Sequence, residues 1–309
     1  MDSQLPVVKT SKLSKKYGSS KTFALKDLDL EVKKSEVYGF LGPNGAGKTT
    51  TIRLMLGLIK PTAGSVQIFG LDAISKKIEV HKRLAYVPGE ATLWPSLTGA
   101  ETLHLLGQIH GSQDVDYLKK LVKRFKFDPN KKVRAYSKGN RQKINLIAAF
   151  ASRAELLLLD EPTAGLDPLM EEAFRTSAIE AKEAGQTVFL SSHILSEVEA
   201  LCDRLAILRD GKLVESGTLA QMRHLSAVSV EAIFDSVPPK VSHIPGVKNV
   251  QITGHQLSCQ VQGDIAPLLA ILSAAKPRSL LSREPSLEEL FLSLYGGKEE
   301  RNLDIADES

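Results

Sequence analysis

The sequence predicts an α/β fold with a buried sheet, followed by a smaller α+β domain. Apolar runs at residues 37–41, 156–159 and 187–191 have the length and composition of strands that are buried on both faces, as in parallel sheets. The first two runs are followed by helical patterns, and such alternation along a chain is typical of α/β proteins. Beyond Met222 short strand patterns replace the alternation, which indicates a second domain.

Residues 7–42 read as a small β-rich region. Residues 27–32 alternate polar and apolar side chains, which predicts a half-exposed strand. Tyr17 precedes that strand in a Lys-Lys-Tyr-Gly turn. Its ring is suited to stack on an adenine base, and a turn aromatic that covers the edge of the core is an equally good interpretation.

Residues 42–49 fit the Gly-x4-Gly-Lys-Ser/Thr pattern of a phosphate-binding loop, between a predicted strand and a predicted helix. Such a loop directs backbone N–H groups and the positive end of the helix dipole at one point, which suits a polyphosphate. Lys48 adds a point charge for the β- and γ-phosphates, and the Thr49 hydroxyl can ligate Mg²⁺. An ordinary Gly-rich turn is the alternative. The predicted nucleotide-binding residues of this segment are Gly42, Pro43, Asn44, Gly45, Ala46, Gly47, Lys48, Thr49 and Thr50.

The region from about residue 91 to 150 has helical character. Thr98 and Glu101 form a capping-box pattern at the start of one helix. Residues 119–134 carry eight basic side chains and one acidic one, which predicts either a solvated helix face or a contact with an acidic partner or lipid headgroups. Ser137 begins a polar turn that leads into an apolar helix ending near Phe150. The N-terminus of this helix offers a second anion site, and the alternative is that Ser137 is a plain helix cap.

The apolar strand at 156–159 ends in two carboxylates, Asp160 and Glu161. Charges at the carboxyl end of such a strand lie where α/β sheets bind ligands. Asp160 is suited to hold Mg²⁺ through water, and Glu161 to act as general base toward an attacking water. An acidic helix cap explains one of these carboxylates, but it does not explain both together with the loop at Lys48.

Three further elements complete the first domain. Asp167 and Pro168 cap a helix that runs to about Gly185. His193 follows the strand at 187–191, as a structural residue or as a sensor of a γ-phosphate. The Asp210-Gly211 pair predicts a hairpin that closes the domain.

The second domain reads as a compact α+β appendage. Its predicted elements are strands at 229–234, 247–252 and 256–261, a helix at 266–274, and a final amphipathic helix that opens at Ser286. The tail from Lys298 is acidic and is expected to be disordered. We thus expect domains at 1–222 and 223–297 and a tail at 298–309. The appendage suits a dimer brace, with ligand sensing as the alternative.

The composition, with 42% hydrophobic and 25% charged residues over 309 positions, is that of a globular protein. The net charge of +4 suits anionic ligands or an anionic membrane face, and simple solubility explains it as well; a nucleic-acid binder is usually more basic. Cys202 and Cys259 match no metal spacing, so we expect free thiols in a reducing compartment. No signal segment and no apolar stretch of about 18 residues is visible, which predicts a protein soluble by itself.

Over residues 5–222 the chain resembles the ATP-binding cassette ATPases, a family of P-loop NTPases. The resemblance implies a mixed sheet core with an antiparallel β subdomain and a helical subdomain at about 91–150. Residues 42–49 match the Walker A loop and 156–160 the Walker B strand. It also implies Glu161 as the catalytic carboxylate, Asp167 in the D-loop, His193 as the switch histidine and Tyr17 as the adenine-stacking aromatic.

Residues 137–141 occupy the place of the family's Leu-Ser-Gly-Gly-Gln signature. In the family this segment contacts the γ-phosphate held by the opposite subunit, so the resemblance implies a head-to-tail homodimer and a nucleotide contact at Ser137, Gly139 and Asn140. Lys138 and Asn140 depart from the signature. Gly89 and Glu90 stand where the family has a Gln that meets Mg²⁺, so either Glu90 serves as the metal ligand or the relay to the membrane partner works differently.

These departures and the appendage resemble the ATPase subunits of ABC-2 type exporters of drugs, peptide antibiotics, lipids or ions. The resemblance implies an ATPase that binds ATP and Mg²⁺ and drives a permease on a separate chain. Such a subunit is cytoplasmic, lies on the inner face of the cell membrane through the permease, and binds no nucleic acid. The alternatives are an ATP-dependent clamp or regulator on nucleic acid or a ribosome, and a nucleotide-binding subunit with poor hydrolysis.

Overall fold

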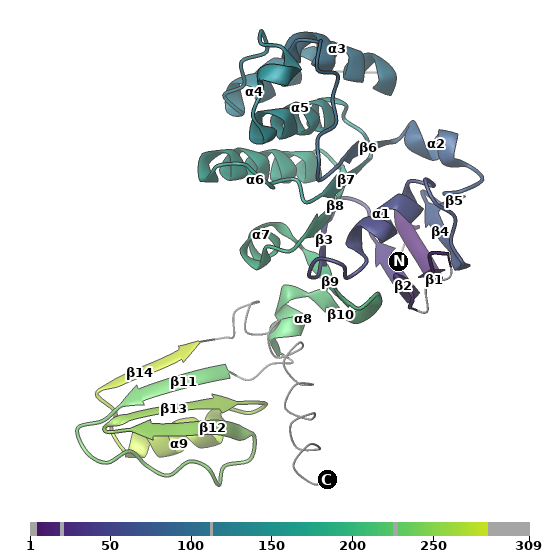
Figure 1. Ribbon diagram of the computed structural model, residues 1–309. Helices are drawn as coiled ribbons and strands as arrows, with labels where there is room; N and C mark the ends of the chain where they lie inside the picture. The colour runs from purple at the N-terminus through teal and green to yellow at the C-terminus, as the bar shows by residue number, and fades with distance from the viewer. Residues whose placement is uncertain (1–4, 19–21, 112–113, 225–227, 284–309) are drawn as a thin grey trace. The chain divides into compact units, whose positions relative to one another are not determined.

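The computed structural model describes residues 5–18, 22–111, 114–224 and 228–283 (Figure 1). The chain divides into two compact units between Ser216 and Gly217. Each unit has its own hydrophobic core. The division falls near the end of a strand, and the predicted boundaries at 222 and 297 stay predictions.

A six-stranded sheet forms the centre of the first unit, in the order β10-β9-β3-β8-β7-β6. Its strands are β3 (Val37–Leu41), β6 (Leu84–Val87), β7 (Leu156–Asp160), β8 (Thr187–Ser192), β9 (Arg204–Arg209) and β10 (Lys212–Thr218). The five strands other than β10 are parallel. Every residue of β3, β7 and β8 is buried, which confirms the predicted buried strands. Because parallel strands end at the same edge, the segments after them meet there.

An antiparallel sheet of four strands, in the order β2-β1-β4-β5, covers the phosphate-loop helix of the first unit. Its elements are β1 (Val8–Lys15), β2 (Leu25–Val32), β4 (Ala63–Ile68) and β5 (Leu71–Asp72), with α1 (Lys48–Met55) and α2 (Lys77–His81) beside them. In β2 the apolar residues 28, 30 and 32 are buried and the residues between them are exposed, as the alternation predicts.

The helical region contains α3 (Gly99–His110), α4 (Val115–Arg124), the 3-10 turn η1 (Val133–Ala135) and α5 (Lys138–Ala151), and Figure 1 shows α3, α4 and α5 grouped together. The capping box is present: Thr98 Oγ1 accepts from the Glu101 N–H at 3.2 Å, and the Glu101 carboxylate accepts from the Thr98 N–H at 2.7 Å. Arg124 ties α4 to the later helix α6 (Pro168–Glu183) through Glu180, at 2.6 Å. This bond is the main reason why the pKa of Glu180 is lowered to about 2.

Two helices and a hairpin complete the first unit. They are α6 (Pro168–Glu183), α7 (Leu195–Leu201) and the β9–β10 pair. Asp210 and Gly211 both have left-handed backbones, with φ of 48° and 73°, as a tight two-residue hairpin turn requires. Gly39 in β3 lets α7 pack closely, because a Cβ there would lie 2.8 Å from Val198.

The second unit is an antiparallel sheet in the order β12-β13-β11-β14 with a helix against it. Its elements are α8 (Leu219–His224), β11 (Val228–Ile233), β12 (Val247–Thr253), β13 (Gln256–Val261), α9 (Ala266–Ala274) and β14 (Ser279–Arg283). The three predicted strands and the helix at 266–274 are present, and β14 was not predicted. The helix expected from Ser286 and the tail from Lys298 lie outside the described residues.

Among the described residues, no helix combines the length and the apolar character that crossing a bilayer requires.

Candidate functional site

Four parallel strands bring many of the predicted site residues to one edge of the central sheet. The phosphate loop follows β3, and Pro88 and Gly89 follow β6. Asp160 ends β7, with Glu161 directly after it, and His193 follows β8. The site is therefore assembled from segments that are far apart in the sequence.

The phosphate loop is held in shape by glycines and by its neighbours. Gly45 and Gly47 have left-handed φ values of 82° and 110°, which other residues adopt only with strain. A Cβ at Gly47 would also lie 2.6 Å from the Ala24 carbonyl oxygen. The Gly211 N–H donates to the Ala46 carbonyl at 3.0 Å from outside the loop. Pro43, Asn44 and Gly45 form its exposed tip.

Lys48 is the first residue of α1, and its side chain lies inside the loop with only 5% exposed. Its ammonium donates to the carbonyl oxygens of Gly42 at 2.7 Å and Pro43 at 3.3 Å. The same nitrogen lies 3.2 Å from Glu161 Oε1. A charged group on a flexible stem can exchange these oxygens for those of a phosphate without leaving the loop.

Asp160 joins the loop to the sheet through both carboxylate oxygens. Oδ2 accepts a hydrogen bond from Thr49 Oγ1 at 3.0 Å, and Oδ1 accepts one from Ser191 Oγ at 2.5 Å. The side chain is 4% exposed. The hydroxyl of Thr49 and this carboxylate are a pair of hard oxygen donors of the kind Mg²⁺ prefers. Mg²⁺ usually completes its shell with water and substrate phosphates, so a fuller protein cage is not needed.

Glu161 lies between Lys48 and His193. Its Oε1 is 3.2 Å from the Lys48 ammonium and 3.3 Å from His193 Nδ1. Its backbone has a left-handed φ of 48°, fixed in part by the hydrogen bond from its N–H to the Ser191 carbonyl at 3.0 Å. A non-glycine residue in this conformation is strained by about 1–2 kcal/mol, and such strain is concentrated at functional sites. The two predicted catalytic residues are therefore neighbours.

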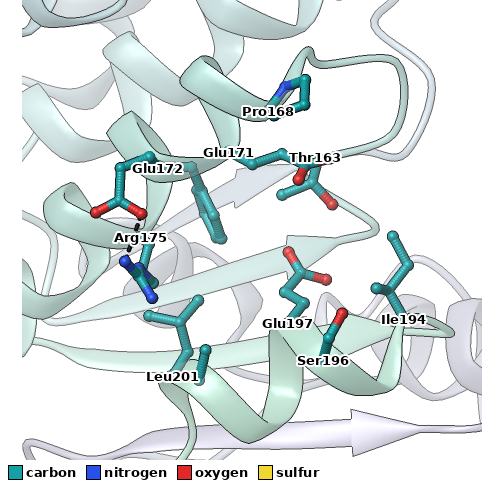
Figure 2. Close-up of a pocket in the computed structure, with 11 residues that line it drawn as sticks. Thr163, Pro168, Glu171, Glu172, Arg175, Ile194, Ser196, Glu197 and Leu201 are labelled. Carbon is teal, nitrogen blue, oxygen red and sulfur yellow. Dashed lines mark ion pairs between the residues drawn. The ribbon is translucent and has the colours of Figure 1, made fainter.

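The segment carrying His193 is held by Glu197 of α7, a residue that the sequence reasoning missed. Ser192 Oγ donates to Glu197 Oε2 at 2.5 Å and accepts from the Ile194 N–H at 2.9 Å. Figure 2 shows the Glu197 carboxyl pointing toward Thr163, two residues after Glu161, in a pocket between α6 and α7. Burial raises the pKa of Glu197 above its usual range.

The predicted second anion site lies at the N-terminus of α5. Ser137 caps the helix, with its Oγ accepting from the Asn140 N–H at 3.3 Å. A Cβ at Gly139 would lie 2.4 Å from the Gly165 carbonyl oxygen, so this helix end is pressed against the segment before α6. Asp167 caps α6 through the Met170 N–H at 3.1 Å. Among the described residues, no hydrogen bond or ion pair joins Ser137, Gly139 or Asn140 to the phosphate loop of the same chain.

Tyr17 lies beside the phosphate loop, with its hydroxyl 3.4 Å from Thr50 Oγ1. The side chain is 43% exposed, and the Lys15 ammonium lies 5.2 Å from the ring centroid. An exposed ring at this place leaves both predicted interpretations of Tyr17 open.

Gly89 lies against the end of β7, because a Cβ there would be 3.2 Å from the Asp160 carbonyl oxygen. Glu90 lines a hollow with Lys138 and Arg141 of α5. Its role as a metal ligand stays a prediction. The buried amide of Gln142 donates to the carbonyl oxygens of Pro88 and Pro162 and was also missed.

Comparison with known proteins places this geometry in context. A family model described as "ABC transporter" matches residues 25–164. The chain is similar to the bacitracin transport ATP-binding protein BcrA of Bacillus licheniformis, with 35% identity over 94% of this chain and 98% of that protein. It is similar to the Nod factor export ATP-binding protein I of Cupriavidus pinatubonensis, with 31% identity over 94% of this chain and 91% of that protein. A solved dimeric ATP-binding cassette bound to ADP and Pi has a TM-score of 0.62 and 25% identity, over 69% of this chain and 98% of the cassette.

Proposed function

The chain belongs to the ATP-binding proteins of the ABC transporter family and is an ATPase, and we propose that it drives a membrane exporter whose permease is a separate polypeptide. The names of its relatives, which transport bacitracin and export Nod factor, support export. These names also argue against the alternative function, an ATP-dependent clamp or regulator that acts on nucleic acid or a ribosome. The observation that carries the proposal is the cluster formed by Lys48, Asp160, Glu161 and His193 at one sheet edge.

In the proposed mechanism the backbone N–H groups of the phosphate loop and Lys48 bind the β- and γ-phosphates of ATP. Lys48 exchanges the Gly42 and Pro43 carbonyls for phosphate oxygens, and it also leaves Glu161. The Glu161 carboxylate is then free to accept the proton of a water that attacks the γ-phosphorus, and the bond to the bridging oxygen of ADP breaks. His193, 3.3 Å from Glu161, keeps that carboxylate oriented.

The oxygens of Thr49 and Asp160 fit a magnesium ion, and they are the residues we propose to hold it. Bound there, Mg²⁺ would supply positive charge that offsets the negative charge developing on the phosphate oxygens. Ser191 keeps Asp160 in place by donating to its other oxygen.

The proposal includes a second copy of the chain, since Ser137, Gly139 and Asn140 belong to a helix end that makes no hydrogen bond or ion pair with the phosphate loop of the same chain among the described residues. In a head-to-tail homodimer these groups complete the site of the opposite copy. The dimeric cassette among the similar structures supports this part of the proposal.

An apolar groove in the first unit supports a protein partner. Leu58, Ile78 and Ile109 line it and are 62%, 66% and 66% exposed. Exposed apolar side chains gathered in one groove are typical of interaction sites. Tyr86 of β6 also lines the groove, and this strand leads directly to Gly89 beside Asp160. We propose that the permease docks here, which holds the chain at the cytoplasmic face of the membrane.

The Glu161→Gln variant tests the mechanism. It should bind ATP as the wild type does in a fluorescent-nucleotide titration, while steady-state phosphate release falls by about 10²-fold or more, since the general base is lost. The matched control is Glu183→Gln on the exposed surface of α6, which should leave both unchanged. Retained hydrolysis in Glu161→Gln would exclude Glu161 as the base.

The exporter assignment has its own test. The neighbouring coding region should encode a protein with about six apolar segments of about 20 residues, and that protein should co-purify with this chain. Charged or polar replacement of Ile78 and Ile109 should abolish the co-purification without lowering ATP binding. Capture of nucleic acid or ribosomes in place of a membrane protein would favour the clamp.

A further inference from the structure

We propose that Gln142 is a positioning residue: it fastens the Ser137 end of α5 to the loops that follow β6 and β7, so that the two loops and the helix shift together. The inference rests on the proposed function, in which Ser137 faces a phosphate held by a second copy. In the dimer, binding of nucleotide against Ser137 at one site then shifts Glu161, which belongs to the other site, through Gln142.

The geometry is that of an amide clamp. Gln142 Nε2 donates to the Pro88 carbonyl at 3.2 Å and to the Pro162 carbonyl at 3.3 Å. The two parallel strands are paired only as far as Val87 and Leu159. The carbonyls that follow them therefore lie beyond the regular ladder, and the two amide hydrogens of one side chain join them across the gap.

Each clamped carbonyl adjoins a residue of the site. Pro88 precedes Gly89, which lies against the Asp160 backbone. Pro162 follows Glu161, whose left-handed backbone leaves it few alternative positions. A small displacement of either loop therefore moves the carboxylate of Asp160 or Glu161. Catalysis requires such groups to be placed within a fraction of an ångström.

The other end of the clamp is the helix itself. Gln142 lies five residues after Ser137, about 7.5 Å along the α5 axis. A helix transmits displacement along its length, and the close packing of Gly139 on the Gly165 carbonyl gives the same helix end a second contact with the Glu161 side of the site.

The chemistry of the side chain argues against a purely structural role. Gln142 is 2% exposed, and its Oε1 has no hydrogen-bond partner among the described residues. An unpaired buried oxygen destabilises a protein, and an apolar side chain of the same shape would avoid that cost. What the amide provides that Met or Leu does not is the pair of donors.

Trp94 offers a direct readout, since it is the one tryptophan in the sequence and lies in the segment between Gly89 and α3. Its side chain is 45% exposed, so its emission responds to changes in its surroundings. Addition of ATP to the magnesium-loaded protein should change this emission when the loop after β6 moves.

The test compares Gln142→Met, which keeps the shape and removes both donors, with Asn145→Leu on the same helix. Asn145 is also a buried amide, but its Nδ2 has no hydrogen-bond partner among the described residues. Gln142→Met should keep the Kd for ATP within about twofold, lower kcat about tenfold and lose at least half of the Trp94 response. Asn145→Leu should keep all three. Unchanged kcat and Trp94 response in Gln142→Met would overturn the proposal.

A second variant covers the case in which Gln142→Met does not fold. In Gln142→Glu, burial favours the neutral carboxylic acid, which can donate one hydrogen bond, whereas the ionised form donates none. Its kcat relative to the wild type should therefore rise as the pH is lowered from 8 to 6, and a constant ratio would contradict the clamp. Absence of hydrolysis in the wild type would count against the proposed function. The Trp94 response, which needs ATP binding and the dimer but no hydrolysis, would still decide the role of Gln142.

Discussion

Gly139→Ala is the substitution that most directly probes the packing of the Ser137 helix end. Gly139 is the second residue of α5, and alanine is the better helix former there. The added Cβ would lie 2.4 Å from the Gly165 carbonyl oxygen. Helix propensity and packing therefore act in opposite directions, so the outcome separates them.

The expected magnitudes follow from that distance. An ordinary contact of a Cβ with an oxygen begins near 3.4 Å, so the helix end and the Gly165 segment must separate by about 1 Å. Overpacking of this size costs about 1–3 kcal/mol, and the gain in helix propensity offsets up to about 1 kcal/mol. The free energy of unfolding should thus fall by about 0–3 kcal/mol. A displacement of about 1 Å at groups that position a substrate lowers turnover about 10²-fold.

The assay is steady-state phosphate release together with nucleotide titration and urea unfolding of the same preparations. ATP binding to the phosphate loop of the same chain serves as the internal control and should be retained, because Gly139 has no contact with that loop among the described residues. Wild-type turnover in Gly139→Ala would refute the reasoning, since the helix end would then tolerate displacement. Loss of ATP binding along with turnover would show that the damage is not local.

Two further predictions concern pH and stability. The pKa of Glu180 is lowered from 4.5 to about 2, chiefly by its hydrogen bond from Arg124. The ionised form therefore contributes at most about 3 kcal/mol to the free energy of unfolding above pH 4.5, and this contribution is lost as the pH falls toward 2. Glu180→Gln should lower the free energy of unfolding at pH 7 by up to that amount, and the deficit should shrink in acid; a deficit independent of pH would contradict the ion pair. The pKa of Glu197 is raised by burial, which favours its neutral form in the folded protein. The stability that this form contributes is fully present below the pKa of the residue in the unfolded chain, and it is lost as the pH rises through the pKa in the folded protein. Glu197→Gln should therefore gain stability relative to the wild type as the pH rises from 4 to 8 in urea unfolding, and an unchanged difference would exclude a buried acid.

Much of the central sheet could be predicted because its signal is strong and local. The run of four leucines at 156–159 strongly favours a buried strand. A loop with Gly45, Gly47 and Lys48 at this spacing strongly favours a phosphate-binding loop. The residues of that loop, of the β7 end and of the β8 end were predicted together because each directly follows such a strand.

The supporting residues left no comparable signal in the sequence. The partners of Gln142 are backbone carbonyls 54 and 20 residues away, and a backbone carbonyl is present at every position. Ser191 and Glu197 act through side chains that are common at strand ends and on helices. Strand β14 reads Ser-Leu-Leu-Ser-Arg, without the alternation of polar and apolar residues that identifies a half-buried strand, and all five of its residues are exposed.

The turn at Gly211 shows that the phosphate loop does not hold its shape alone. This residue donates to Ala46 at 3.0 Å, and its own carbonyl accepts from the Lys26 N–H of β2 at 2.7 Å. A hairpin more than 150 positions downstream thus braces the back of the loop and fastens it to the other sheet. The amides facing the ligand are consequently preorganised, and capture of a triphosphate requires little loss of backbone entropy. A fragment that kept every residue of the motif but ended before β9 would lack the hydrogen bonds of Gly211 that support the loop.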